Sequence, residues 1–179
     1  DVETDDNVLR QTTARLPWLL IGMLGGIGNS MILGNFGTTF AAHPEMALYI
    51  PLIGGTGGNV GTQSSALVVQ GLANSSLDTK DTFKQILKET VVASINATII
   101  SLLVYLYNFI RFGATATVTY SVSISLFAVV MFASIFGTFV PMTLEKLKID
   151  PAIATGPFIS ITNDIIGMML YMGITVLLS

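Results

Sequence analysis

The sequence predicts an all-α membrane protein with five transmembrane helices. Only 11% of its 179 residues are charged, whereas soluble domains carry about 25%. Hydrophobic residues make up 51% of the chain and its mean hydropathy is +0.72. Several apolar stretches reach the roughly 20 residues that one membrane-spanning helix needs. No stretch alternates with a period of two, so helices rather than barrel strands are expected.

The apolar stretches follow a polar segment, residues 1–15. We expect spans at residues 16–40, 46–73, 86–110, 118–144 and 151–178, so that residues 16–179 form one transmembrane domain. Because the chain starts with a cluster of acidic residues and without Met, we expect it to be part of a longer protein. No internal repeat is evident, and an odd number of spans argues against two inverted halves. A five-helix chain is small for a pore, so we expect a homodimer.

The basic residues predict the orientation of these spans. Seven of the eight fall on one side: Arg10, Arg15, Lys80, Lys84, Lys88, Lys146 and Lys148. Only Arg111 falls on the other side. Because Lys and Arg concentrate in cytoplasmic segments, the N-terminus is expected in the cytoplasm and the C-terminus outside. A multi-pass membrane protein follows, with the lipid bilayer and a second copy as partners and no nucleic acid.

The second expected span is rich in glycine. It contains five glycines within eight residues: Gly54, Gly55, Gly57, Gly58 and Gly61. Glycine weakens a helix by about 1 kcal/mol relative to Ala, so this helix is expected to be broken or distorted there. Thr56, Asn59, Thr62 and Gln63 add polar side chains to this stretch, so we expect it to line an ion path. The alternative is helix packing, because Gly54/Gly58 and Gly57/Gly61 are both G-x-x-x-G pairs.

The fifth span carries a stripe of small and polar residues at helical spacing. Its members are Gly156, Ser160, Asn163, Asp164, Gly167 and Tyr171. Asp164 lies about halfway along the span, where a charge costs about 2.5–3.5 kcal/mol on insertion scales. An intramembrane carboxylate usually marks a path for ions or protons, so we expect the stripe to line one. The alternative is that Asp164 only holds helices together.

Two prolines shape our expectation for the start of this fifth span. Asp150 and Pro151 have the residue types of an N-cap and a first helical position, and Asp150 would also lie at the cytoplasmic mouth of an ion path. Pro157 would then lie inside the helix and release the carbonyl near Ile153.

The expected cargo is a hydrated divalent cation held by Asp164. One carboxylate per chain, two in a dimer, is few for dehydrated calcium, whereas magnesium readily keeps several waters. Manganese or cobalt fit the same argument. The alternative function is a secondary transporter that couples a cation to protons through Asp164. No enzyme is expected, because an aspartyl type needs two buried carboxylates and no in-span His or Lys could activate a serine.

Other polar residues of the spans are expected to have structural roles and not to line the ion path. We expect Asn29, Asn35 and Asn96 to hydrogen-bond between helices. Glu89 begins the third span near the cytoplasmic surface, where a solvated or snorkelling carboxylate is expected.

Two segments, PLIGGTGGNVGTQSS at residues 51–65 and DPAIATGPFISITNDIIG at 150–167, resemble the membrane domain of the MgtE family of magnesium channels. The opening RLPWLL, residues 15–20, is similar too, and the resemblance covers essentially the whole chain. It implies a homodimer in the plasma (inner) membrane, whose second and fifth helices surround the pore, with Asp164 facing a hydrated magnesium ion. It also implies that Gly58 and Asn59 lie near the pore and Asp150 near its cytoplasmic end.

The resemblance further implies cytosolic N-terminal and CBS domains that sense magnesium and close the channel through a connecting helix. Those sensor domains are absent from this sequence, and residues 1–15 resemble the end of the connecting helix. Gly156 departs from family members that carry an asparagine at the cytoplasmic gate.

Overall fold

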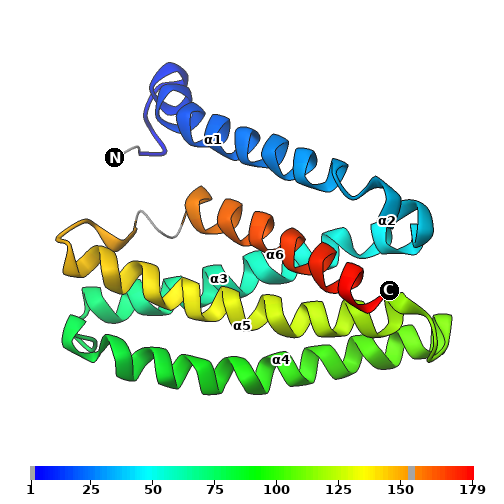
Figure 1. Ribbon diagram of the computed structural model, residues 1–179. Helices are drawn as coiled ribbons and strands as arrows, with labels where there is room; N and C mark the ends of the chain where they lie inside the picture. Colours follow the sequence, from blue (N-terminus) through cyan, green and yellow to red (C-terminus); the bar gives the residue numbers. More distant parts are fainter. Residues whose placement is uncertain (1–2, 153–155) are drawn as a thin grey trace.

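The computed structural model describes residues 3–152 and 156–179, which contain helices and no strands. Six α-helices and two short 3-10 helices follow one another (Figure 1). The α-helices are α1 (Val8–Gly34), α2 (Gly37–Ala42), α3 (Ile50–Ala73), α4 (Thr82–Phe112), α5 (Thr117–Lys146) and α6 (Pro157–Leu178). The 3-10 helices are η1 (Pro44–Tyr49) and η2 (Thr79–Asp81).

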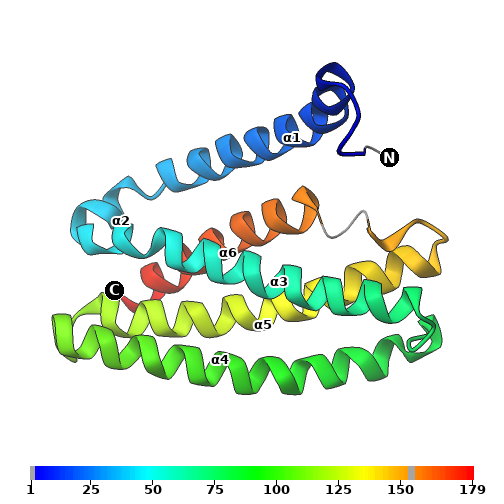
Figure 2. The same cartoon turned by 180° about the vertical axis from the view of Figure 1, so that it is seen from behind.

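Helix α5 is the centre of the bundle. It packs against α3, α4 and α6, and it contributes more buried residues than any other helix of the described chain. Helix α1 packs against α6 and lies apart from α4 and α5 in both views (Figures 1 and 2). None of its residues is buried. The α1 side of the bundle is therefore open, whereas the α5 side is closed.

Four helical segments within the described residues are long and apolar enough to cross a membrane: Val8–Gly34, Thr79–Phe112, Thr117–Lys146 and Pro157–Leu178. Helix α3 has 24 residues, and at about 1.5 Å per residue it is long enough for a hydrocarbon core of about 30 Å. It is less apolar because of its glycines and polar side chains. It lies alongside α5 in both views (Figures 1 and 2). The all-helical membrane fold is confirmed, with four helices that meet the apolar criterion and a fifth of sufficient length.

The predicted break in the glycine-rich segment is wrong. Helix α3 is continuous from Ile50 to Ala73. It stays helical because two of its glycines permit close packing: Gly57 lies against Val129 of α5, and Gly61 lies against Asn163 of α6. The lost helix propensity is offset by contacts that a larger side chain would prevent.

The fifth span starts later than predicted. Helix α6 begins at Pro157 and not at Pro151, and Pro157 occupies its first turn, where the missing N–H breaks no helical hydrogen bond. Asp150 caps a separate turn, because its Oδ1 accepts a hydrogen bond from the Ala152 N–H at 3.0 Å. The expected free carbonyl near Ile153 lies outside the described residues.

The first helix starts earlier than predicted. Helix α1 begins at Val8, where the side chain of Asn7 accepts a hydrogen bond from the Arg10 N–H at 2.9 Å. It runs without interruption through Pro17 into the first apolar span and ends at Gly34. That residues 1–15 end a cytosolic connecting helix stays a prediction.

One end of the bundle collects nearly all the basic residues. The start of α1, the loop between α3 and α4, and the segment after α5 lie at this basic end (Figure 1). It carries all the Lys and Arg residues except Arg111, which lies in the last turn of α4 at the other end. A chain that crosses the membrane five times must bring these basic residues to one side, and the fold does place them at one end.

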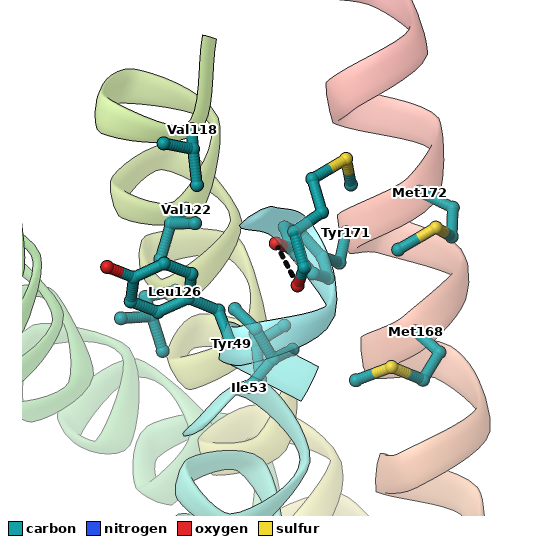
Figure 3. Close-up of a cluster of buried hydrophobic side chains, with 10 residues drawn as sticks. Tyr49, Ile53, Val118, Val122, Leu126, Met168, Tyr171 and Met172 are labelled. Atoms are coloured by element: carbon teal, nitrogen blue, oxygen red, sulfur yellow. Dashed lines mark hydrogen bonds between the residues drawn. The ribbon is translucent and has the colours of Figure 1, made fainter. Parts of the chain in front are cut away.

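A buried cluster at the other end fixes the start of α3. Side chains from η1, α3, α5 and α6 meet there, among them Tyr49, Ile53, Leu126 and Met168 (Figure 3). The Tyr171 hydroxyl donates a hydrogen bond to the Met46 carbonyl at 2.9 Å (Figure 3). The Tyr49 hydroxyl donates to Oδ1 of Asn108 on α4. These two bonds anchor η1, from which α3 begins.

Candidate functional site

A groove of about 460 Å³ lies between α1, α3 and α6. It is open on one side, and polar and small residues dominate its wall. The lining residues are Asn29, Ile50, Pro51, Gly54, Gly55, Gly58, Asn59, Thr62, Ser160, Asp164 and Met168. Four residues that the sequence singled out, Gly58, Asn59, Ser160 and Asp164, are thus brought together.

Asp164 is the only ionisable residue of this wall. It projects from the middle of α6 and is partly buried. A Cβ placed on Gly54 would lie 3.4 Å from its Oδ1, so the carboxylate rests against the backbone of α3. Within the described residues no side chain or backbone N–H donates a hydrogen bond to this carboxylate. The carboxylate therefore faces the groove and forms no hydrogen bond to a neighbouring helix among the described residues.

Helix α3 supplies the opposite wall. A Cβ on Gly58 would meet nothing within 4 Å, so the missing side chain widens the groove there. Asn59 and Thr62 add an amide and a hydroxyl beside it. The five glycines between Gly54 and Gly61 therefore divide into two sets: Gly54, Gly55 and Gly58 line the groove, whereas Gly57 and Gly61 pack against other helices.

Helix α1 contributes Asn29, which the sequence analysis assigned to interhelical hydrogen bonding. That interpretation is wrong: Asn29 lines the groove, and its buried Oδ1 has no hydrogen-bond partner in the described residues. The exposed Asn35 and Asn96 also form no side-chain hydrogen bond there. A lone Asn in an apolar span gives no signal of which face it occupies, so its place in the groove was missed.

Asn163, Gly167 and Tyr171 do not line this groove, contrary to the single stripe expected on α6. Asn163 is 1% exposed and its side chain lies against Gly61. A Cβ on Gly167 would meet Ile53 and Val129 at 3.8 Å. Successive residues of a helix point about 100° apart, so Asn163 and its neighbour Asp164 belong to different faces.

Two further predicted residues, Gly156 and Asp150, lie outside the groove wall. Gly156 is the N-cap residue of α6, and Asp150 is exposed and caps its own turn. Both precede the first turn of α6 at the basic end, where a mouth was predicted.

Glu89, which was expected to be solvated or snorkelling, also forms a hydrogen bond to another helix. This carboxylate is only partly exposed, and its Oε1 accepts a hydrogen bond from Oγ of Ser64 at 2.6 Å. The bond joins α4 to α3 on the side away from the groove.

The groove offers oxygen atoms from one carboxylate, two amides and two hydroxyls. Oxygen donors suit hard cations such as Mg²⁺ and Ca²⁺. The described residues contain no cluster of three or more His, Cys, Asp or Glu side chains that could hold a metal. A single carboxylate cannot replace the water shell of a divalent ion, so the donor set fits an ion that keeps most of its waters.

A bundle of apolar helices with one polar, carboxylate-bearing groove defines a multi-pass membrane protein of the solute-transport class. Comparison with known families agrees with this. The profile of the family MgtE, described as a divalent cation transporter, matches residues 50–174. The chain belongs to this family.

Individual relatives extend the similarity to almost the whole chain. A magnesium transporter MgtE of Bacillus subtilis is 32% identical over 174 residues, which cover 97% of this chain. A magnesium transporter MgtE of Thermus thermophilus is 33% identical over 165 residues, or 92% of the chain. The matched regions make up only 38% and 36% of these two relatives, so the chain spans little more than a third of their length.

Proposed function

We propose that this chain is the ion-conducting domain of a magnesium channel, in which Asp164 holds a hydrated Mg²⁺ ion. The observation that carries the proposal is an unpaired carboxylate in a polar groove between α3 and α6. Both relatives are named magnesium transporters, which supports Mg²⁺ as the cargo. Mn²⁺ and Co²⁺ have similar ligand preferences and are alternative cargo.

A second copy of the chain would complete the conduit. The groove is open on one side, and α1 leaves much apolar surface exposed beside it, including Leu19, Leu24 and Met31. In a homodimer two Asp164 carboxylates would face the same ion through its water shell. Such a pair concentrates a divalent cation without having to strip it of water.

The direction of flow follows from the membrane potential. With the basic end in the cytoplasm, the interior-negative potential drives cations inward. It contributes about 2.3 kcal/mol per charge per 100 mV, and therefore about twice that for Mg²⁺. In a full-length protein, cytosolic N-terminal and CBS domains would regulate this flow from the N-terminal side of α1.

The first test is magnesium uptake into proteoliposomes that contain a magnesium-sensitive dye. We expect Asp164→Asn to reduce the initial rate at least tenfold, because the substitution removes the only charge of the groove while nearly preserving its shape. Asp78→Asn is the matched control: it removes one carboxylate from the exposed loop at the basic end and should transport at the wild-type rate. Uptake by Asp164→Asn at the wild-type rate would reject the coordinating role.

The alternative is a secondary transporter that exchanges the cation for protons through the same carboxylate. A pH-sensitive dye in the same vesicles separates the two mechanisms. A channel changes the internal pH only through leak, whereas a coupled carrier moves protons in fixed proportion to Mg²⁺. Proton flux that disappears together with Mg²⁺ flux in Asp164→Asn would favour the carrier.

A further inference from the structure

A second pocket lies at the basic end, remote from the groove. It has a volume of about 440 Å³ and is formed by η2, the first turns of α4 and the last turn of α5. Its lining residues are Thr79, Lys80, Thr82, Phe83, Ile86 and Lys146. Two lysines and an aromatic residue therefore share one concave surface where α4 begins its span.

Neither lysine forms an ion pair within the described chain, although the Lys80 charge also contributes to lowering the pKa of the neighbouring Asp78 carboxyl. The one ion pair found there joins Arg10 to Asp6, far from this pocket in the sequence. Lys80 and Lys146 are both exposed, and they approach the pocket from different elements, η2 and α5. Their ammonium groups are thus available to an anion lying between them.

The nearby acidic residues do not line the pocket. The Asp78 carboxylate is engaged in its own turn, where it accepts hydrogen bonds from the Lys80 N–H at 3.2 Å and the Thr79 hydroxyl at 3.3 Å. The bond from the Lys80 N–H holds the pKa of Asp78 below its usual range. Asp81 and Glu145 are exposed and also lie outside the lining. The two ammonium groups are therefore the only charges on the pocket wall.

The rest of the wall is apolar and continues along α4. Phe83 is 74% exposed, and it is followed on α4 by the exposed apolar residues Leu87 and Val91. Because α4 is a candidate membrane span, we expect this exposed apolar surface to face hydrocarbon. The charged part of the pocket then lies at the depth of lipid headgroups. A ligand that fits has a negative head and a long apolar tail.

We propose that this pocket binds one anionic phospholipid, with the phosphate between Lys80 and Lys146 and an acyl chain along Phe83 and α4. Charge complementarity and the position at the start of a span identify the lipid. Basic pockets between helices at the cytoplasmic surface are suited to such headgroups. The site shares no residue with the Asp164 groove, so it does not depend on the proposed function.

The test measures lipid retention by native mass spectrometry after release from nanodiscs of phosphatidylcholine and phosphatidylglycerol. The pocket variant is Lys80→Gln with Lys146→Gln. The matched control is Lys84→Gln with Lys148→Gln, which removes the same charge at the same end from residues that do not line the pocket. We expect the pocket variant to lose selective phosphatidylglycerol retention about 25-fold, since each Lys near an anionic surface contributes about 1 kcal/mol.

The possible outcomes distinguish a specific lipid site from non-specific attraction to the net positive charge, and from a site for soluble phosphate. Selective loss in the pocket variant alone supports the proposal. An equal loss in both variants would mean that only the net charge of this end matters, and would overturn it. Displacement of the lipid by millimolar inorganic phosphate, with Phe83→Ser retaining lipid as the wild type does, would show a soluble anion site and also overturn it. Magnesium uptake through Asp164 in phosphatidylcholine vesicles would remain in every case.

Discussion

The two sides of α6 use similar residues for opposite purposes. On the side of α3 and α5, Asn163 and Gly167 are buried in close helix packing. On the side of α1, Ser160 and Asp164 face an open groove. Helix α3 repeats the division, because Gly61 packs whereas Gly58 borders the groove. Small and polar residues in a span therefore do not by themselves indicate a lining role.

The contrast lies in what each side chain touches. The packed face is defined by backbone approach: a Cβ placed on Gly137 of α5 would lie only 2.7 Å from the carbonyl oxygen of Gly61. The groove face has space instead of contacts, and its carboxylate has no hydrogen-bond donor from the described residues. Substitutions on the packed face should change stability, and substitutions on the groove face should change ion flux.

The largest stability effect is expected from Gly137→Ala. Its methyl group would meet the backbone of Gly61, which cannot rotate away, so α3 and α5 must separate. Overpacking of this kind costs typically 1–3 kcal/mol. Reversible unfolding in mixed micelles at increasing denaturing detergent measures the loss.

The matched control for that substitution is Gly58→Ala on the groove face. It adds the same methyl group where nothing lies within 4 Å, so stability should be unchanged or higher by up to about 1 kcal/mol. Magnesium flux should change in Gly58→Ala, because the methyl group narrows the groove. If both variants were equally destabilised, the distinction between the two faces of α3 would be lost.

The sequence predicted the long apolar helices well and the fifth span poorly. Residues 86–110 and 118–144 were expected, and α4 and α5 extend them by only a few residues at either end, because unbroken apolar runs define a span. The start of α6 was misplaced because Asp150-Pro151 and Gly156-Pro157 both have the composition of a helix start. Only the folded chain shows which pair is used.

The candidate site could be predicted in part for a similar reason. Spacing of three or four residues found Ser160 and Asp164, but it also admitted Asn163 and Gly167, which lie one face further round the helix. Asn29 was missed as a groove residue because its helix carries no polar stripe. The depth of Asp164 was readable from the sequence, whereas the partners of each neighbouring residue depend on tertiary contacts.

A medium loss of stability is expected from Tyr171→Phe, which tests the buried cluster at the end of the bundle opposite the basic end. The substitution removes the hydroxyl that donates to the Met46 carbonyl and leaves that acceptor without this donor. A net loss of about 1 kcal/mol is expected in the same unfolding measurement. Tyr105→Phe is the control, because Tyr105 is 38% exposed and no hydrogen bond to its hydroxyl is present in the described chain. If both variants lost the same free energy of unfolding, the hydrogen bond from Tyr171 to Met46 would not be the cause of the loss.

The smallest effect, and the sharpest test of the comparison, is expected from Asn163→Leu. Both polar atoms of the Asn163 amide are buried without a hydrogen-bond partner among the described residues. An unsatisfied buried polar group costs about 1–3 kcal/mol, whereas an apolar group of the same shape does not. Leu has the same branching as Asn, so it should pack against Gly61 with unchanged or higher stability. Magnesium uptake should persist in this variant, in contrast to the at least tenfold loss expected for Asp164→Asn one residue away. Lost uptake with intact folding would instead place Asn163 on the ion path, and α6 would then act as one polar stripe and not as two opposed faces.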